Sequence, residues 1–179
     1  LLVAWFSGGG HWYCTREAEL AINKRESQQA IDWLQLADDS SSRTHYLFAQ
    51  AYRRQGDVKS VHKHLKRAKE LGFTRALLQR EQWLMMAQLG RLRESEKSLK
   101  RLMRGDDPHP GEICEALVTG YLRQYRFDDA GIVINAWKAD YPDDPQPHFC
   151  LGMVWVHLQT WRKAAAEFQL ALDIDSNHH

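Results

Sequence analysis

The chain has 179 residues, of which 44% are hydrophobic and 26% are charged, and its formal net charge is +1. This length is enough for one domain with a buried interior, and the composition excludes a disordered chain and a chain made mostly of membrane spans. Only 5 prolines and 11 glycines separate long stretches of good helix-forming residues, which predicts an all-α protein.

Residues 1–13 form the first predicted segment. Leu1 to Phe6 are apolar and lead into Ser7-Gly8-Gly9-Gly10. Such a short apolar run cannot span a bilayer, which needs roughly 20 residues. The segment is therefore either an N-terminal arm that packs on the first helices or the remnant of a hydrophobic anchor. We expect a cytoplasmic protein, and the alternative is a protein anchored to a membrane through an N-terminal segment missing from this chain.

Residues 14–41 predict a shortened helical hairpin. Ala18 and Ala21 in its first helix face a second set of apolar residues across the polar turn 23–26; this set is Ala30, Leu34 and Ala37.

The rest of the chain repeats at an offset of 34 residues, in the blocks 42–75, 76–109, 111–144 and 145–178. The turn Gln55-Gly56-Asp57 recurs as Leu89-Gly90-Arg91, Gln124-Tyr125-Arg126 and Gln159-Thr160-Trp161. Apolar or small residues recur at seven fixed places, which in the third block are Cys114, Leu117, Val118, Tyr121, Ala130, Ile134 and Trp137. At about 100° per residue, four of them share a face of a first helix and three share a face of a second. Each block therefore predicts a helical hairpin that must stack on its neighbours to bury this stripe.

This pattern resembles the tetratricopeptide repeat family, and the residues closest to its consensus are Leu151-Gly152, Trp155, Ala164, Phe168 and Ala171. The resemblance implies that residues 14–179 form a single right-handed α-solenoid of five stacked antiparallel hairpins. It also implies a non-catalytic scaffold that binds an extended peptide or a helix in its concave groove. The alternative is a structural spacer or oligomerisation module of a larger protein, which could associate with another copy through its C-terminal hairpin.

Four places in each first helix point nearly opposite to the packed stripe, and in the resembling family these places line the groove. With Glu81 at the edge, the candidate partner-binding residues are Arg43, Tyr46, Gln50, Arg53, Arg80, Glu81, Leu84, Glu112, Glu115, Thr119, Phe149 and Met153. The groove would run from basic to acidic to apolar. A partner should then carry an acidic segment at one end, and Arg80 is expected to be exposed in the groove.

Sequence motifs for catalysis are missing: no phosphate-binding loop, zinc-protease motif or nucleophile elbow occurs. We therefore expect no enzyme activity, no cofactor and no metal. His62-Lys63-His64 does not change this expectation, because alternate residues of a helix point about 200° apart and cannot share an ion; a solvated face is favoured. The widely spaced Cys14, Cys114 and Cys150 are expected to be small core residues.

Charge is unevenly distributed along the chain. Block 42–75 carries nine basic and two acidic side chains, whereas block 111–144 carries three basic and seven acidic ones. The basic residues Lys59, Lys63, Lys66 and Arg67 lie opposite the apolar Val61, Leu65 and Ala68, which indicates a solvated outer face. An acidic protein partner is the first alternative for this block, and nucleic acid is disfavoured.

Overall fold

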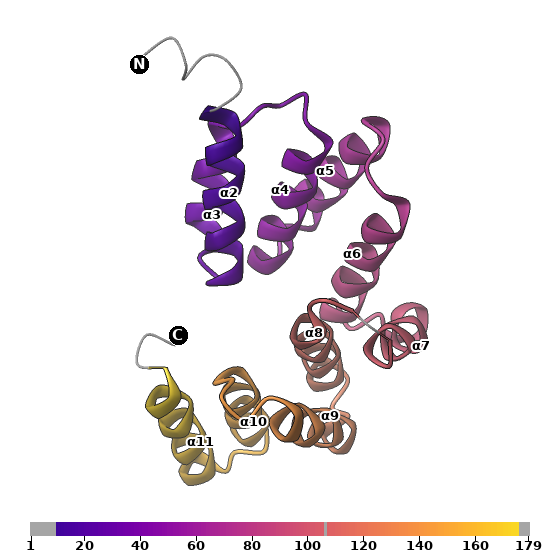
Figure 1. The fold of residues 1–179 in the computed structure, drawn as a ribbon. Helices are drawn as coiled ribbons and strands as arrows, with labels where there is room; N and C mark the ends of the chain where they lie inside the picture. Colours follow the sequence, from indigo (N-terminus) through magenta and orange to yellow (C-terminus); the bar gives the residue numbers. More distant parts are fainter. Residues whose placement is uncertain (1–9, 106, 176–179) are drawn as a thin grey trace. The chain divides into compact units, whose positions relative to one another are not determined.

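The computed structural model describes residues 10–105 and 107–175. Within these ranges all regular structure is helical, in ten helices (Figure 1): α2 (Gly10–Asn23), α3 (Ser27–Gln35), α4 (Ser42–Gln55), α5 (Val58–Glu70), α6 (Arg75–Gln88), α7 (Leu92–Met103), α8 (Pro110–Arg123), α9 (Phe127–Asp140), α10 (Gln146–His157) and α11 (Trp161–Ile174). The predicted all-α fold is confirmed. In this part of the chain no helix has both the length and the apolar character required to cross a membrane.

The N-terminal boundary differs from the predicted one. Helix α2 begins at Gly10, so residues 10–13, assigned to an arm, belong to the first helix. The apolar run Leu1 to Phe6 lies outside the described residues.

The helices form two compact units, Leu1–Gln82 and Trp83–His179, and the boundary falls inside α6. In the first unit α2 packs on α3, α3 on α4, and α4 on α5. In the second unit α7 packs on α8, α8 on α9, α9 on α10, and α10 on α11. Within each unit, successive helices are neighbours, as stacked hairpins require (Figure 1).

A left-handed residue follows each first helix of the repeats. These residues are Arg25, Gly56, Gly90, Tyr125 and Gln159, with φ angles of 66°, 78°, 79°, 57° and 54°. At each of them two backbone N–H groups donate to the last turn of the helix; Gly56 N, for example, donates to Arg53 O and Asp57 N to Tyr52 O, both at 3.0 Å. This pair of hydrogen bonds satisfies backbone carbonyl groups at the helix end that have no partner within the helix. The chain thereby reverses direction in two or three residues. In the last repeat the left-handed residue is Gln159, one before the expected Thr160.

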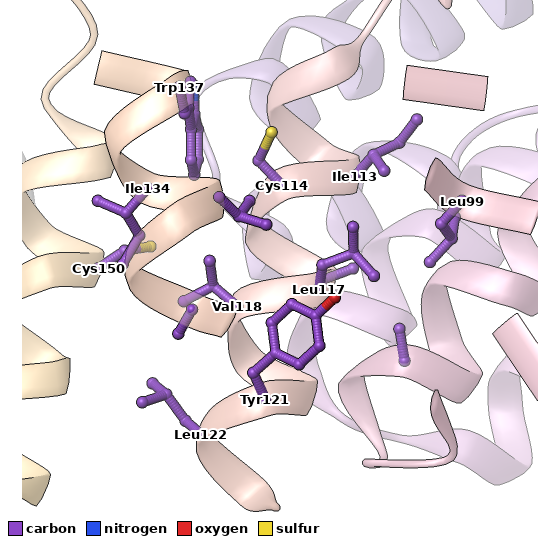
Figure 2. Close-up of a cluster of buried hydrophobic side chains, with 14 of the residues drawn as sticks. Leu99, Ile113, Cys114, Leu117, Val118, Tyr121, Leu122, Ile134, Trp137 and Cys150 are labelled. Atoms are coloured by element: carbon purple, nitrogen blue, oxygen red, sulfur yellow. The ribbon is translucent and has the colours of Figure 1, made fainter. Parts of the chain in front are cut away.

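Each unit has its own apolar core. In the first unit the core joins α2, α3 and α4 through residues such as Ala18, Leu34 and Leu47. In the second unit it runs from α6 to α10, and all seven stripe residues of block 111–144 are buried in it. Figure 2 shows the part of this core between Leu99 of α7 and Cys150 of α10. Trp137, Tyr121 and Leu117 are at most 2% exposed. The expectation that the three cysteines are core residues is confirmed, since all are free and buried.

The core of the second unit contains a position where two helices approach too closely for any side chain. A Cβ placed on Gly120 of α8 would lie 2.5 Å from the carbonyl oxygen of Ala87 and 2.8 Å from Leu92 Cδ2. By contrast, a Cβ on Gly131 of α9 would meet no atom within 4 Å.

These two helical glycines provide a matched test of the packing. Gly120→Ala is expected to destabilise the protein by roughly 1–3 kcal/mol, because α6 and α8 must separate to admit the methyl group. Gly131→Ala should stabilise it by about 0.5–1 kcal/mol, because the helix gains a better former without a clash. Urea unfolding followed by circular dichroism measures both changes, and equal free energies for the two variants would contradict the close approach.

Candidate functional site

Most of the predicted groove residues in the first unit are buried. Tyr46 stacks on Phe73 with ring centroids 4.5 Å apart, and Gln50 Nε2 donates to the Tyr46 hydroxyl at 3.2 Å. Both side chains are thus engaged with neighbouring groups of the same unit, and neither is more than 9% exposed. Arg43 alone among the predicted residues of α4 is well exposed, and it pairs with Glu19 of α2.

Arg53 and Glu81 form a buried ion pair that joins α4 to α6. Arg53 Nε donates to Glu81 Oε1, and the two side chains are 3% and 0% exposed. Arg80 is also buried, at 5% exposure. The expectation that Arg80 is exposed is therefore wrong. For Arg53 the physical reason is that its face of α4 is turned toward Glu81 of the next first helix, α6, which covers it.

In the second unit the corresponding places are more accessible, with the exception of Leu84, which is fully buried in the core. Partly exposed are Glu112, Glu115 and Thr119 of α8 and Phe149 and Met153 of α10. We call these five residues the α8/α10 surface. The two helices are in contact, and Gln146 Nε2 at the start of α10 donates to Glu115 Oε1 at 3.4 Å. The structure therefore brings these predicted residues together on adjacent helices.

The apolar part of the α8/α10 surface is supported from below. Phe149 lies against Phe168 of α11, with ring centroids 5.6 Å apart, and Met153 packs against the core of the second unit. Both side chains are thus held in place while part of each remains open to solvent. Anchored but accessible apolar groups of this kind are what a peptide-binding surface presents.

A buried histidine pair joins α4 to α5 in the first unit. His45 Nδ1 and His64 Nδ1 are 3.0 Å apart, and His45 Nε2 lies 3.0 Å from the carbonyl oxygen of Asp39. Because a carbonyl only accepts, His45 carries its proton on Nε2, so its Nδ1 accepts from the Nδ1–H of His64. The expected solvated face is thus correct for His62 and Lys63, which are exposed, but wrong for His64.

Burial of His64 has an electrostatic consequence. Desolvation, followed by the positive potential of His45 and Lys63, lowers the pKa of His64 from 6.5 to about 4, and Asp39 opposes the shift only weakly. The ring also stacks on Phe48, with centroids 4.5 Å apart, which keeps it in an apolar setting. His64 is therefore neutral at physiological pH. Sequence reasoning missed this pair because its members lie 19 residues apart, on two helices.

A carboxylate of α7 is the centre of a polar network in the second unit. Glu96 accepts from the Tyr121 hydroxyl and from Lys100 Nζ, both at 2.8 Å, and from Arg126 Nη1 at 3.0 Å. Burial raises its pKa, but the hydrogen bonds from these three groups outweigh it and lower the pKa to about 2. Glu96 is therefore ionised and fully engaged in tying α7 to α8 and to the start of α9.

Five cations form a stripe along α7 that sequence reasoning did not single out. They are Arg93, Lys97, Lys100, Arg101 and Arg104, which follow one another at helical spacing. Four are exposed, and Lys100 is partly exposed. We call this set the α7 stripe. Its signal in the sequence is the spacing of basic residues at one-turn intervals, which block charge totals conceal.

Neither a metal-binding cluster nor a reactive Cys114 is found among the described residues. They contain no group of three histidine, cysteine or acidic side chains that could hold a metal ion. Burial, followed by the nearby Asp140 and Asp144, raises the pKa of the Cys114 thiol to about 12, so this cysteine is not a thiolate at neutral pH.

Comparisons with known proteins bear on the fold. No protein-family model matches the sequence, and a search of curated proteins found no match. The structure is similar to the crystal structure of YrrB, described as a TPR protein with an unusual peptide-binding site. The TM-score is 0.50 and the sequence identity is 17%, and the match covers 90% of this chain and 84% of YrrB. The chain thus has the tetratricopeptide repeat fold, as its sequence predicted.

The His45–His64 pair predicts that the first unit loses stability in mild acid. Unfolded His64 takes up a proton near pH 6.5, whereas the folded ring does so only near pH 4. The unfolded state therefore binds more protons between these values, and the free energy of unfolding should fall by up to roughly 2 kcal/mol as the pH drops through this range.

His64→Gln removes the titrating group while keeping a donor for His45. The loss of stability between pH 7.5 and 5 should shrink in this variant, and it should be unchanged in the control His62→Gln, whose side chain is exposed. Urea unfolding at the two pH values measures the change in the free energy of unfolding for each protein. A pH dependence that is the same in His64→Gln as in the wild type would contradict the assignment.

Proposed function

We propose that this tetratricopeptide-type chain is a non-catalytic scaffold that binds a protein or peptide segment on the α8/α10 surface. The fold supports a binding role, and the solved protein with a similar fold is itself described as having a peptide-binding site. The observation that carries the proposal is the pair Phe149 and Met153. Phe149 is held against Phe168 and Met153 against the core of the second unit, and both are partly open to solvent.

The chemistry of this surface indicates what the segment should contain. Phe149 and Met153 fit an apolar anchor, and the thioether of Met153 adapts readily to different side chains. Glu112 and Glu115 give the adjoining part of the surface a negative potential, which favours a segment with a basic residue beside its anchor. This differs from the acidic segment expected for a groove lined by Arg53 and Arg80, because those two arginines are buried.

A catalytic role has little support in the same residues. The α8/α10 surface contains no nucleophile next to a base: the Thr119 hydroxyl donates to the backbone carbonyl of Glu115 at 2.8 Å. Binding without chemistry is therefore the function that this surface supports best.

Met153→Asp tests the proposal directly. A buried charge cannot replace an apolar anchor, so Met153→Asp should capture the partner from an extract of the source cells about tenfold or more weakly than the wild type does. Ile132→Asp is the matched control, because Ile132 of α9 is 69% exposed, is not part of the surface, and undergoes the same chemical change. Quantitative mass spectrometry of captured proteins measures both.

Two results would overturn this assignment. One is a set of captured proteins that Met153→Asp retains as well as the wild type does. The other is a set that both substitutions remove equally, since that would point to a general loss of the fold or of exposed apolar area.

A second candidate function, an oligomerisation module, is favoured by the last helix. Trp161, Ala165 and Leu172 share one face of α11, and Trp161 and Leu172 are 63% and 40% exposed. Within the described residues, α11 packs mainly on α10, and Lys138 of α9 pairs with its Glu167. Exposed apolar stripes of this kind are found where two protein surfaces meet. A second copy of the chain could cover this face in a symmetric dimer.

Light scattering at micromolar concentration separates the two candidate functions. The oligomerisation candidate predicts a dimer for the wild type and a monomer for Leu172→Glu, because the introduced carboxylate would be buried in the shared face. A monomeric wild type, or a dimer that Leu172→Glu leaves intact, would exclude this face as the interface. The partner-binding proposal does not depend on the result.

A further inference from the structure

We propose that the α7 stripe is a second interaction surface, and that it binds an acidic protein segment with carboxylates spaced about one helical turn apart. The α7 stripe lies outside the α8/α10 surface. It would bind through charge, whereas the α8/α10 surface would bind through apolar anchors. The five residues follow at intervals of four, three, one and three, which places them within about 100° of arc on one helix.

The acidic residues of α7 do not neutralise the stripe. Glu94 pairs with Arg91 at 2.8 Å. Glu96 is held by Lys100 and Arg126. Throughout residues 10–105 and 107–175, no acidic side chain lies within ion-pair distance of Arg93, Lys97, Arg101 or Arg104. Four cations on one helix face thus have no carboxylate partner among the described residues.

This arrangement opposes the stability of the helix. Like charges one turn apart destabilise a helix by roughly 0.2–0.5 kcal/mol per pair. Lys100, Arg101 and Arg104 lie at the C-terminal end of α7, where the helix dipole favours cations. Arg93 lies in the first turn, where the same dipole disfavours a cation. The dipole therefore accounts for one end of the stripe but not for its full length.

The fold itself does not require cations at these places. At the repeat interval, α5 carries Lys59, Lys63, Lys66 and Arg67 at the first four places and the acidic Glu70 at the fifth. In α9 the corresponding residues are Asp128, Ile132, Asn135, Ala136 and Ala139. Since α9 forms the same hairpin without them, the basic residues are confined to two consecutive repeats. A recognition role explains this restriction, whereas a requirement of the hairpin does not.

An acidic protein segment fits the stripe better than nucleic acid does. The chain has a net charge of +1 and an isoelectric point near 7.9, far from the strongly basic balance of nucleic-acid-binding domains. Helix α7 carries no aromatic residue on which a base could stack. The stripe spans about 16 Å, the length of roughly three helical turns, and its arginines can each hold a carboxylate through two hydrogen bonds.

Fluorescence anisotropy with defined probes tests the proposal. The probe is a labelled helical peptide of about 16 residues with Glu at one-turn intervals on an alanine background. The same peptide with Gln in place of Glu, and an oligo(dT) of equal net charge, serve as comparisons. The variant is Arg93→Glu with Lys97→Glu. The matched control is Lys24→Glu with Arg162→Glu, which makes the same charge change at two exposed positions, one in the turn after α2 and one on α11.

The wild type is expected to bind the Glu peptide and not the Gln peptide. The stripe variant should bind about tenfold or more weakly at low salt, the control should stay within about threefold of the wild type, and the loss should shrink as added salt screens the charges. Arg93→Gln with Lys97→Gln should show an intermediate loss. Circular dichroism melts confirm that each variant is folded.

Several outcomes would overturn the proposal: no binding of the Glu peptide by the wild type, equal loss in the stripe variant and its control, or tighter binding of oligo(dT) that the stripe variant abolishes. The last result would assign the stripe to nucleic acid. Met153→Asp should leave binding of the Glu peptide unchanged, so failure here is distinguishable from failure of the α8/α10 surface. If Met153→Asp removes that binding, the acidic segment does not dock on α7.

Discussion

The left-handed turn that ends each first helix is the constraint on which the rest of the structure depends. It reverses the chain within a few residues, so that the second helix can return along the first and cover its apolar stripe. At Gly56 and Gly90 this conformation is nearly free, but at Arg25, Tyr125 and Gln159 a side chain stands in a region that costs about 1 kcal/mol or more. The surrounding packing must supply that energy at the three positions without glycine.

The elements and their buried faces could be predicted from the sequence because they depend on local periodicity. Cys114, Tyr121 and Trp137 were assigned to the core from their spacing alone, and all are buried. Periodicity fixes which residues share a face, but it does not say how many neighbours cover the opposite face. This is why Arg53 and Arg80 were expected in an open groove. In the structure Arg53 pairs with Glu81, a residue 28 positions away on another hairpin, and no single-helix pattern contains that information.

The polar interactions in the interior differ between the two units. The first unit buries the His45–His64 pair and the Arg53–Glu81 ion pair, each of which joins different helices. The core of the second unit is mainly apolar, and its main polar network, centred on Glu96, lies at the edge, with Glu96 22% exposed. A buried ion pair adds little net stability over apolar packing, but one that has lost a partner costs about 3–5 kcal/mol. Such pairs therefore favour one register of α4 against its neighbours over slipped alternatives.

This difference bears on where a partner can bind. In the first unit the groove side chains already bond to one another, so a ligand would have to break those bonds before it gained any of its own. In the second unit Phe149 and Met153 leave apolar area open, and a ligand that covers it displaces only water. The α7 stripe adds charges whose repulsion an acidic segment would relieve. We therefore place the two proposed binding surfaces where side chains stay accessible: apolar anchoring at α8/α10 and charge at α7.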